Sequence, residues 1–155
     1  MADDADRESV ERVIAAPAEA IFALVSDPAR HHEFDGSGTV RRAKVSSGPV
    51  GKGSTFTMGM KLGVPYSMVN TIIEFEPGRR IAWQTRPPGA LLGKFIGGRI
   101  WRYELEPVDG GTRVRETWDI SEERHKKAVE PVRKKARESM VKTLERIEGI
   151  VTTPR

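Results

Sequence analysis

The chain contains 155 residues, of which 37% are hydrophobic and 31% charged, and it contains no cysteine. This length favours one domain with a core that buries roughly 70% of the unfolded surface, and the lack of cysteine excludes disulfides, thiolate metal sites and cysteine nucleophiles. The formal net charge of +4 does not amount to the basic field of a dedicated nucleic-acid-binding protein.

The beginning of the chain, MADDADRE, is acidic where a signal peptide would be basic. No later stretch approaches the ~20 apolar residues of a membrane span. We therefore expect a soluble, cytoplasmic protein that forms a single domain over residues 1–155, with residues 1–7 disordered.

The first predicted elements are a strand over 8–14 and a short helix after it. Pro17 suits a first helical turn, and Ile21 and Leu24 follow with helical spacing. The dipeptide Asp27-Pro28 ends this helix, and a second brief helical turn leads to Phe34.

Residues 39–119 are interrupted by glycine and proline roughly every 8 to 15 residues, a cadence typical of an antiparallel meander. Six segments between these breaks are rich in β-branched and aromatic residues: 40–45, 54–62, 66–75, 80–85, 99–107 and 112–120. Together with the first strand they predict a sheet of seven strands.

Beyond residue 120 the apolar residues recur at steps of three and four. They are Val129, Val132, Ala136, Met140, Leu144, Ile147 and Val151. The pattern predicts a C-terminal helical region over 121–151, with a long amphipathic helix that begins near Glu130 and has Pro131 in its first turn. Its lysines and arginines are interpreted first as a solvated face.

The sheet has one apolar face and the long helix one apolar stripe, so each should cover the other. The predicted fold class is α+β: a curved, seven-stranded antiparallel sheet wrapped around a long C-terminal helix, with two short helices after the first strand. Such a sheet touches the helix over only part of its surface, and the hollow that remains is a candidate ligand site.

Four motifs in this order carry a family resemblance: APAEAIF at 16–22, VSDP at 25–28, IEFEPGRRIAW at 73–83, and YELEP at 103–107 leading to GGTRV at 110–114. The chain resembles the polyketide cyclase/dehydrase branch of the START-like, Bet v 1-like (SRPBCC) superfamily. This resemblance implies a helix-grip fold whose internal cavity takes lipids, sterols, polyketides or aromatic compounds. Members often have tryptophans around the second short helix, where this chain has HHEF at 31–34.

Alternation along the strands assigns side chains to the inner face of the sheet. The predicted ligand-binding residues are Phe34, Phe56, Met58, Met60, Tyr66, Met68, Trp83, Phe95, Trp101, Tyr103, Glu116, Trp118, Met140 and Leu144. The methionines would form an adaptable lining, although a plain packed core is the alternative for each residue. The segment 66–75 has apolar residues of both parities, which indicates either a bulge or two covered faces.

Glu116 is the most informative residue, because the parity that buries Val114 and Trp118 also turns this carboxyl inward. Burial would raise its pKa and make it a candidate general acid or base, with Tyr103 as a catalytic partner. Alternatively, Glu116 reaches a mouth of the sheet, or pairs with Arg99 or a helix lysine. Tyr66 and Asn70 are further polar candidates.

The segment 86–99, RPPGALLGKFIGGR, combines four apolar residues with four glycines. It could close over the cavity as a lid, contact a membrane surface peripherally, or pack on the protein.

Other chemistry is not indicated. His31 and His32 are interpreted as solvent groups of a surface turn, and we predict no metal. No dinucleotide fingerprint, phosphate loop or nucleophile elbow is present, so we predict no cofactor.

Three functions remain open. The first is binding of a hydrophobic or amphipathic small molecule between the sheet and the C-terminal helix. The second is a cyclase or dehydratase that uses a cavity carboxylate, and the third is an interaction module that presents the 86–99 segment to a membrane or protein. The aromatic residues lie on a concave face under a helix, which argues against nucleic acid as a partner.

Overall fold

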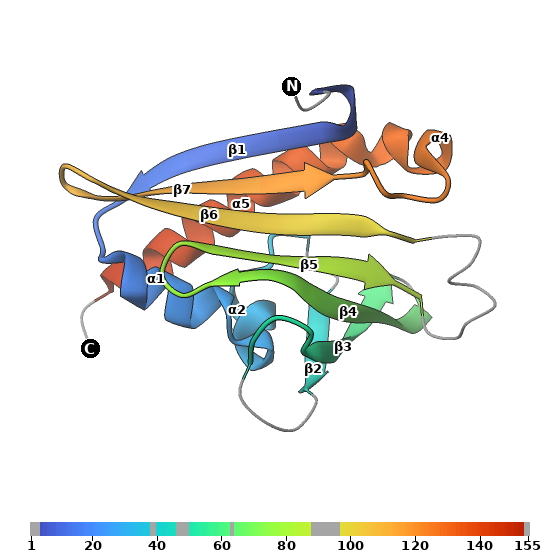
Figure 1. The fold of residues 1–155 in the computed structure, drawn as a ribbon, viewed down its shortest axis with the longest axis horizontal. Coiled ribbons are helices and arrows are strands. Elements are labelled where there is room, and N and C mark those ends of the chain that lie inside the picture. Colours follow the sequence, from blue (N-terminus) through green and yellow to red (C-terminus); the bar gives the residue numbers. More distant parts are fainter. Residues whose placement is uncertain (1–3, 38–39, 46–49, 63, 88–96, 154–155) are drawn as a thin grey trace.

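The computed structural model describes residues 4–37, 40–45, 50–62, 64–87 and 97–153. Their architecture is α+β, a curved antiparallel sheet with a C-terminal helix against its concave face, as the sequence predicts (Figure 1). The described strands are β1 (Arg7–Ile14), β2 (Val40–Val45), β3 (Thr55–Leu62), β4 (Val64–Glu76), β5 (Arg80–Arg86), β6 (Arg99–Val108) and β7 (Gly111–Asp119).

The strands of this sheet lie in the order β1-β7-β6-β5-β4-β3-β2, and every neighbouring pair is antiparallel. Strands β2 to β7 follow one another as a meander, and β1 adds to the open edge of β7. The first and last strands of the chain order are therefore neighbours. The N-terminal stretch also enters the described structure, because Asp4–Asp6 form a short 3-10 turn and Arg7 opens β1.

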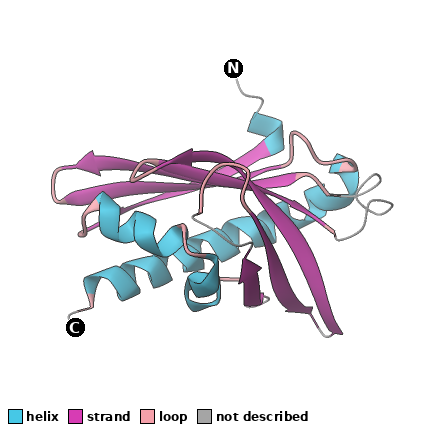
Figure 2. Cartoon of the chain, turned by 60° about the horizontal axis from the view of Figure 1, so that its bottom comes forward, coloured by secondary structure: helices cyan, strands magenta, loops and turns pink. Residues whose placement is uncertain are grey.

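The helices lie together on one side of the sheet (Figure 2). They are α1 (Ala18–Val25), α2 (His31–Phe34), α4 (Lys126–Val129) and α5 (Arg133–Thr152). Two 3-10 turns, Pro28–Arg30 and Glu130–Val132, connect α1 to α2 and α4 to α5. Pro131 lies in the second of these turns, where its missing N–H leaves no helical hydrogen bond unmade. The continuous helix thus begins at Arg133.

One stripe of α5 is buried against the sheet, namely Ala136, Met140, Thr143, Leu144 and Ile147. Arginines beside this stripe hold the helix to the first strand: Arg133 donates to the carbonyl of Arg7 at 2.5 Å, and Arg137 to the carbonyl of Ser9 at 3.0 Å. Both also pair with Glu8. The basic stripe is therefore only in part a solvated face.

A bulge in β4 explains why apolar residues occur at both odd and even positions of this strand. The register with β5 shifts between Ile72 and Glu74, so Ile72 pairs with Trp83 and Phe75 pairs with Ile81. A bulge moves the following residues to the other face. Phe75, which follows the bulge, therefore reaches the inner side as Ile72 does, and its ring packs edge-on against Phe22 at 5.4 Å.

Candidate functional site

Five rings pack together between α2 and the inner face of the sheet. His31 stacks on Trp83 with centroids 4.8 Å apart, and its edges meet Phe34 at 5.2 Å and Phe56 at 5.5 Å. Trp83 continues the row to Tyr103 at 5.7 Å. Offset and edge-on contacts at these distances each contribute about 0.5–1.5 kcal/mol beyond burial. The rings form an ordered wall contributed by α2, β3, β5 and β6.

The interpretation of His31 as a solvent group is wrong. Its side chain is buried, and Nε2 lies 3.0 Å from the carbonyl oxygen of Val25 at the end of α1. Burial lowers the pKa of His31 to about 4, so the ring is neutral near pH 7. The helical spacing of three from Phe34 was the sequence signal that could have placed His31 on the buried face. His32, one residue on, is exposed as expected.

Glu116 lies on the inner face of β7, opposite Tyr103 of β6 and Val10 of β1. Only 4% of the residue is exposed, and its Oε2 accepts a hydrogen bond from the Tyr103 hydroxyl at 3.1 Å. Burial raises the pKa of Glu116 to about 8, against the opposing effect of the Tyr103 hydrogen bond. Burial and the adjacent carboxyl also raise the pKa of Tyr103 well above its usual value. The predicted alternative, a pair with Arg99 or a helix lysine, is not found among the described residues.

The second carboxyl oxygen of Glu116 is buried and has no hydrogen-bond partner among the residues that the structure describes. The indole Nε1 of Trp118, two residues further along the same inner face, is also buried and unpartnered. Such atoms are uncommon in folded proteins and cost about 1–3 kcal/mol each unless a water or a ligand satisfies them. Glu116 and Trp118 therefore present one carboxyl oxygen and one N–H donor that no described residue satisfies.

The other predicted ligand-binding residues are brought to this interior to different degrees. Phe56, Met58, Met140 and Leu144 are fully buried in the core, whereas Met60 and Trp101 are partly buried and pack against it. Met68 is partly buried, and Tyr66 is 40% exposed at the outer end of β4. Tyr66 is thus not an enclosed wall residue. Phe95 and the central part of the 86–99 segment lie outside the described residues.

Two polar groups lie on the inner face near the start of β6. Asn70 accepts a hydrogen bond from the Thr85 hydroxyl at 2.6 Å and is buried, which satisfies this further polar candidate within the sheet. Arg99 pairs with Thr85 in the register and forms an ion pair with Glu123 at 4.0 Å. Sequence patterns gave no indication of Glu123, because it lies in the connection after β7 rather than in a periodic element.

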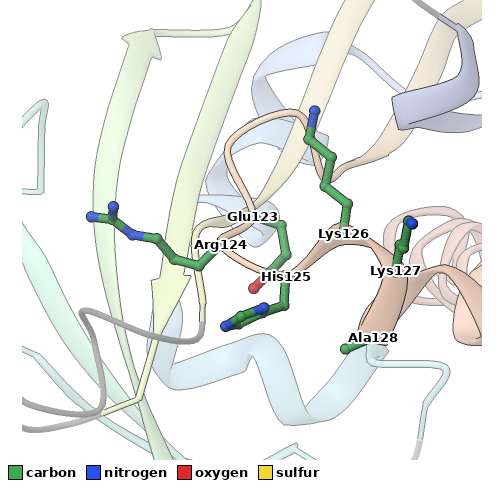
Figure 3. A pocket seen from close by; sticks show the side chains of 6 residues that line it. All are labelled: Glu123, Arg124, His125, Lys126, Lys127 and Ala128. Atoms are coloured by element: carbon green, nitrogen blue, oxygen red, sulfur yellow. The ribbon is translucent and has the colours of Figure 1, made fainter.

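Two hollows on the surface are lined mainly by charged and polar side chains. One, of about 530 Å³, is bounded by residues 123–128 (Figure 3). The other, of about 680 Å³, lies mainly on the outer face of the sheet, around Arg102, which bonds to Glu74 at 2.7 Å and to Asp119 at 3.2 Å. Neither is lined by the aromatic wall or by Glu116.

Within the described ranges, no group of three His, Asp or Glu side chains is arranged to hold a metal ion. None of the helices found there is long and apolar enough to cross a membrane.

Comparison with known families now identifies the class. Residues 7–148 match the family described as polyketide cyclase/dehydrase and lipid transport. Because the match covers most of the chain, the protein belongs to this family, as the four sequence motifs indicate.

A relative among curated proteins is the uncharacterized protein Rv0088 of Mycobacterium tuberculosis, which is 40% identical over 108 residues. The aligned stretch covers 68% of this chain and 44% of that protein, so the chain spans less than half the length of this relative.

Solved structures share the fold at low sequence identity. Protein NE0264 from Nitrosomonas europaea superimposes with a TM-score of 0.73 at 14% identity, covering 96% of this chain and 95% of that one. The di-domain ARO/CYC StfQ from the steffimycin biosynthetic pathway gives a TM-score of 0.68 at 12% identity, covering 94% of this chain and 50% of that one.

Proposed function

We propose that this protein binds an amphipathic small molecule between the sheet and α5, with a polar group of the ligand against Glu116 and Trp118. The observation that carries this proposal is the buried carboxyl of Glu116, which has one oxygen bonded to Tyr103 and the other unpartnered. A core built only for stability would not need a carboxyl at this position, since burial of an incompletely paired acid opposes folding.

The two unpartnered atoms, the second oxygen of Glu116 and Nε1 of Trp118, limit the chemical class of the ligand. With a pKa of about 8, Glu116 is mostly neutral near pH 7 and can donate or accept a hydrogen bond. Trp118 Nε1 can only donate. A carbonyl or hydroxyl oxygen fits both groups, whereas a pure hydrocarbon would leave them unsatisfied. The aromatic wall and the methionines supply the apolar contacts for the remainder of such a molecule.

Family membership supports a ligand of this class, since the family description covers both polyketide cyclisation or dehydration and lipid transport. We infer a cytoplasmic location from the lack of cysteine in the sequence, which suits a reducing compartment.

The test is native mass spectrometry of the protein purified from its own cells, followed by identification of any retained molecule. We expect wild-type protein to retain an oxygen-bearing apolar compound, and Glu116→Gln to retain less of it because the amide changes the donor pattern. Glu106→Gln is the matched control, since this carboxylate is exposed on the adjacent strand. Equal retention by all three proteins would remove Glu116 from the binding site.

A second candidate function is a cyclisation or dehydration reaction, and the same carboxyl favours it. A buried acid whose pKa lies near 8 can give up and regain a proton near neutral pH, as a general acid or base must. Incubation of a retained hydroxy-ketone with the protein should then release a product lighter by one water. Glu116→Gln should lose conversion of the compound to a greater extent than it loses binding. An unchanged mass of the compound after incubation with wild-type protein favours ligand binding without catalysis.

A further inference from the structure

A second incompletely paired group lies on the inner face at the start of β6, four residues before Tyr103. Arg99 is the first residue of β6 and shares its parity with Trp101 and Tyr103. Four residues separate it from Tyr103, which corresponds to roughly 13 Å along a strand. Arg99 and Glu116 therefore mark two ends of one inner surface, with Trp101 between them.

Arg99 has an unusual pairing. Its Nε lies 4.0 Å from Oε2 of Glu123, beyond hydrogen-bond distance, and both atoms are buried without a hydrogen-bond partner in the described part of the chain. The other oxygen of Glu123 accepts a bond from the Gly97 backbone N–H at 2.7 Å, which anchors this carboxylate to the chain. The side chain of Glu123 is 3% exposed and that of Arg99 is 32% exposed. The pair is thus held apart, with the arginine partly open to solvent.

An arginine fork usually meets a carboxylate or phosphate with two short bonds. Here burial lowers the pKa of Arg99, and the anionic partner is too distant to compensate by hydrogen bonding. The guanidinium remains charged at any physiological pH. It therefore has unused capacity to bind an anion at the start of β6.

The charge around this end of the molecule also favours an anion. The hollow bounded by residues 123–128 includes Glu123 together with Arg124, Lys126 and Lys127 (Figure 3). Exposed cations near a binding residue attract negatively charged ligands and raise their rate of association.

We propose that Arg99 binds the acidic group of an amphipathic ligand, a carboxylate or a phosphate monoester, whose apolar part lies along the inner face toward Trp101 and Glu116. This inference rests on the proposed function, since it assigns a headgroup to the same interior ligand. In the absence of ligand Glu123 partly neutralises Arg99, so the two anions compete for one guanidinium.

The test uses two fluorescent probes with the same aromatic skeleton. N-phenyl-1-naphthylamine is neutral, and 8-anilinonaphthalene-1-sulfonate carries one acidic group. Affinities are measured for the wild type, Arg99→Gln, Glu123→Gln and the control Arg115→Gln, whose side chain is exposed on the outer face of β7. Energy transfer from the protein's tryptophans to the probe reports binding near the interior. Decanoate, decyl phosphate and decanol then compete with the anionic probe, which distinguishes a carboxylate ligand from a phosphate ligand.

We expect Arg99→Gln to weaken the anionic probe about ten- to a hundredfold, the loss typical of one charge-assisted contact, while the neutral probe changes less than about twofold. Glu123→Gln should strengthen the anionic probe alone, because it removes the competing carboxylate. Arg115→Gln should alter neither affinity. Decanoate or decyl phosphate should displace the probe better than decanol.

Different outcomes separate the two proposals. If the neutral probe binds but Arg99→Gln affects neither probe, or affects both equally, the acidic-headgroup inference is wrong and the binding function stands. If neither probe binds wild-type protein, both proposals fail. If Arg99→Gln does not fold, the affinities of Arg99→Lys and Glu123→Gln for the two probes test the inference instead. Unchanged affinity of Glu123→Gln for the sulfonate would then overturn the inference.

Discussion

Glu116→Gln should change how the stability of the protein depends on pH. Burial raises the pKa of this carboxyl to about 8, so the folded state holds a proton that the unfolded state, with an ordinary pKa of 4.5, releases. Between these two values the folded protein binds about one proton more than the unfolded chain. The free energy of unfolding should therefore fall as the pH rises.

The magnitude follows from the size of the shift. Each pH unit in this window removes about 1.4 kcal/mol from the free energy of unfolding, so the contribution of Glu116 declines by about 3–4 kcal/mol between about pH 5 and pH 8. The glutamine variant keeps the shape of the side chain and can still accept the Tyr103 hydrogen bond, but it does not titrate. Its stability should exceed that of the wild type progressively as the pH rises.

The assay is urea unfolding followed by tryptophan fluorescence at several pH values between about 5 and 8. The quantity of interest is the difference in free energy of unfolding between variant and wild type, because the titration of His31 contributes equally to both and cancels. A difference that stays constant across this range would refute the burial of an incompletely paired acid at this position.

Three further predictions concern the packing around the site. His31→Phe should make the free energy of unfolding less dependent on pH between about pH 4 and 6.5. In the wild type the folded pKa of His31, about 4, lies below the unfolded value of 6.5, so stability is lost as the pH falls through this window. Urea titrations across this range test the prediction, and an unchanged slope would contradict the burial of His31. Met140→Ala should lower the free energy of unfolding by about 2–5 kcal/mol, as measured by chemical denaturation. Val141→Ala, at a neighbouring side chain that is 40% exposed, should lower it by less than about 0.5 kcal/mol. Similar losses would argue against the assigned helix face. Gly111→Ala should lower the thermal midpoint, since its Cβ would lie 2.0 Å from the Ile14 carbonyl oxygen. Gly149→Ala has open space around it and should raise stability by up to about 1 kcal/mol. A tolerated Gly111→Ala would contradict the close approach of β1.

The architecture could be predicted because its determinants are local. Glycine and proline divide the strands at positions that the structure keeps, and the step of three and four residues after Glu130 marks the buried stripe of α5. Alternation in β7 likewise predicts that Glu116 turns inward with Val114 and Trp118, because parity alone determines the face of a strand residue.

The details that sequence patterns did not supply are pairings between distant segments. Tyr103 was nominated with Glu116, but their hydrogen bond depends on the register between β6 and β7. The burial of His31 depends on where α2 meets the sheet, and the local signal for it, the spacing of three from Phe34, spans a single helical turn. A pair between Arg99 and Glu116 is one of the alternatives that the sequence leaves open, and Arg99 instead meets Glu123, a residue of an irregular connection that no periodicity describes.

The central claim is that a ligand enters the interior between the sheet and α5, and the methionines of the chain offer direct reporters of it. Met58 and Met140 are both buried in the core, on β3 and α5 respectively. In protein labelled with 13C at the methionine methyl groups, N-phenyl-1-naphthylamine should give intermolecular nuclear Overhauser effects to both methyls. Contacts confined to surface groups, with the Met58 and Met140 signals unshifted at saturating probe, would contradict an interior binding site.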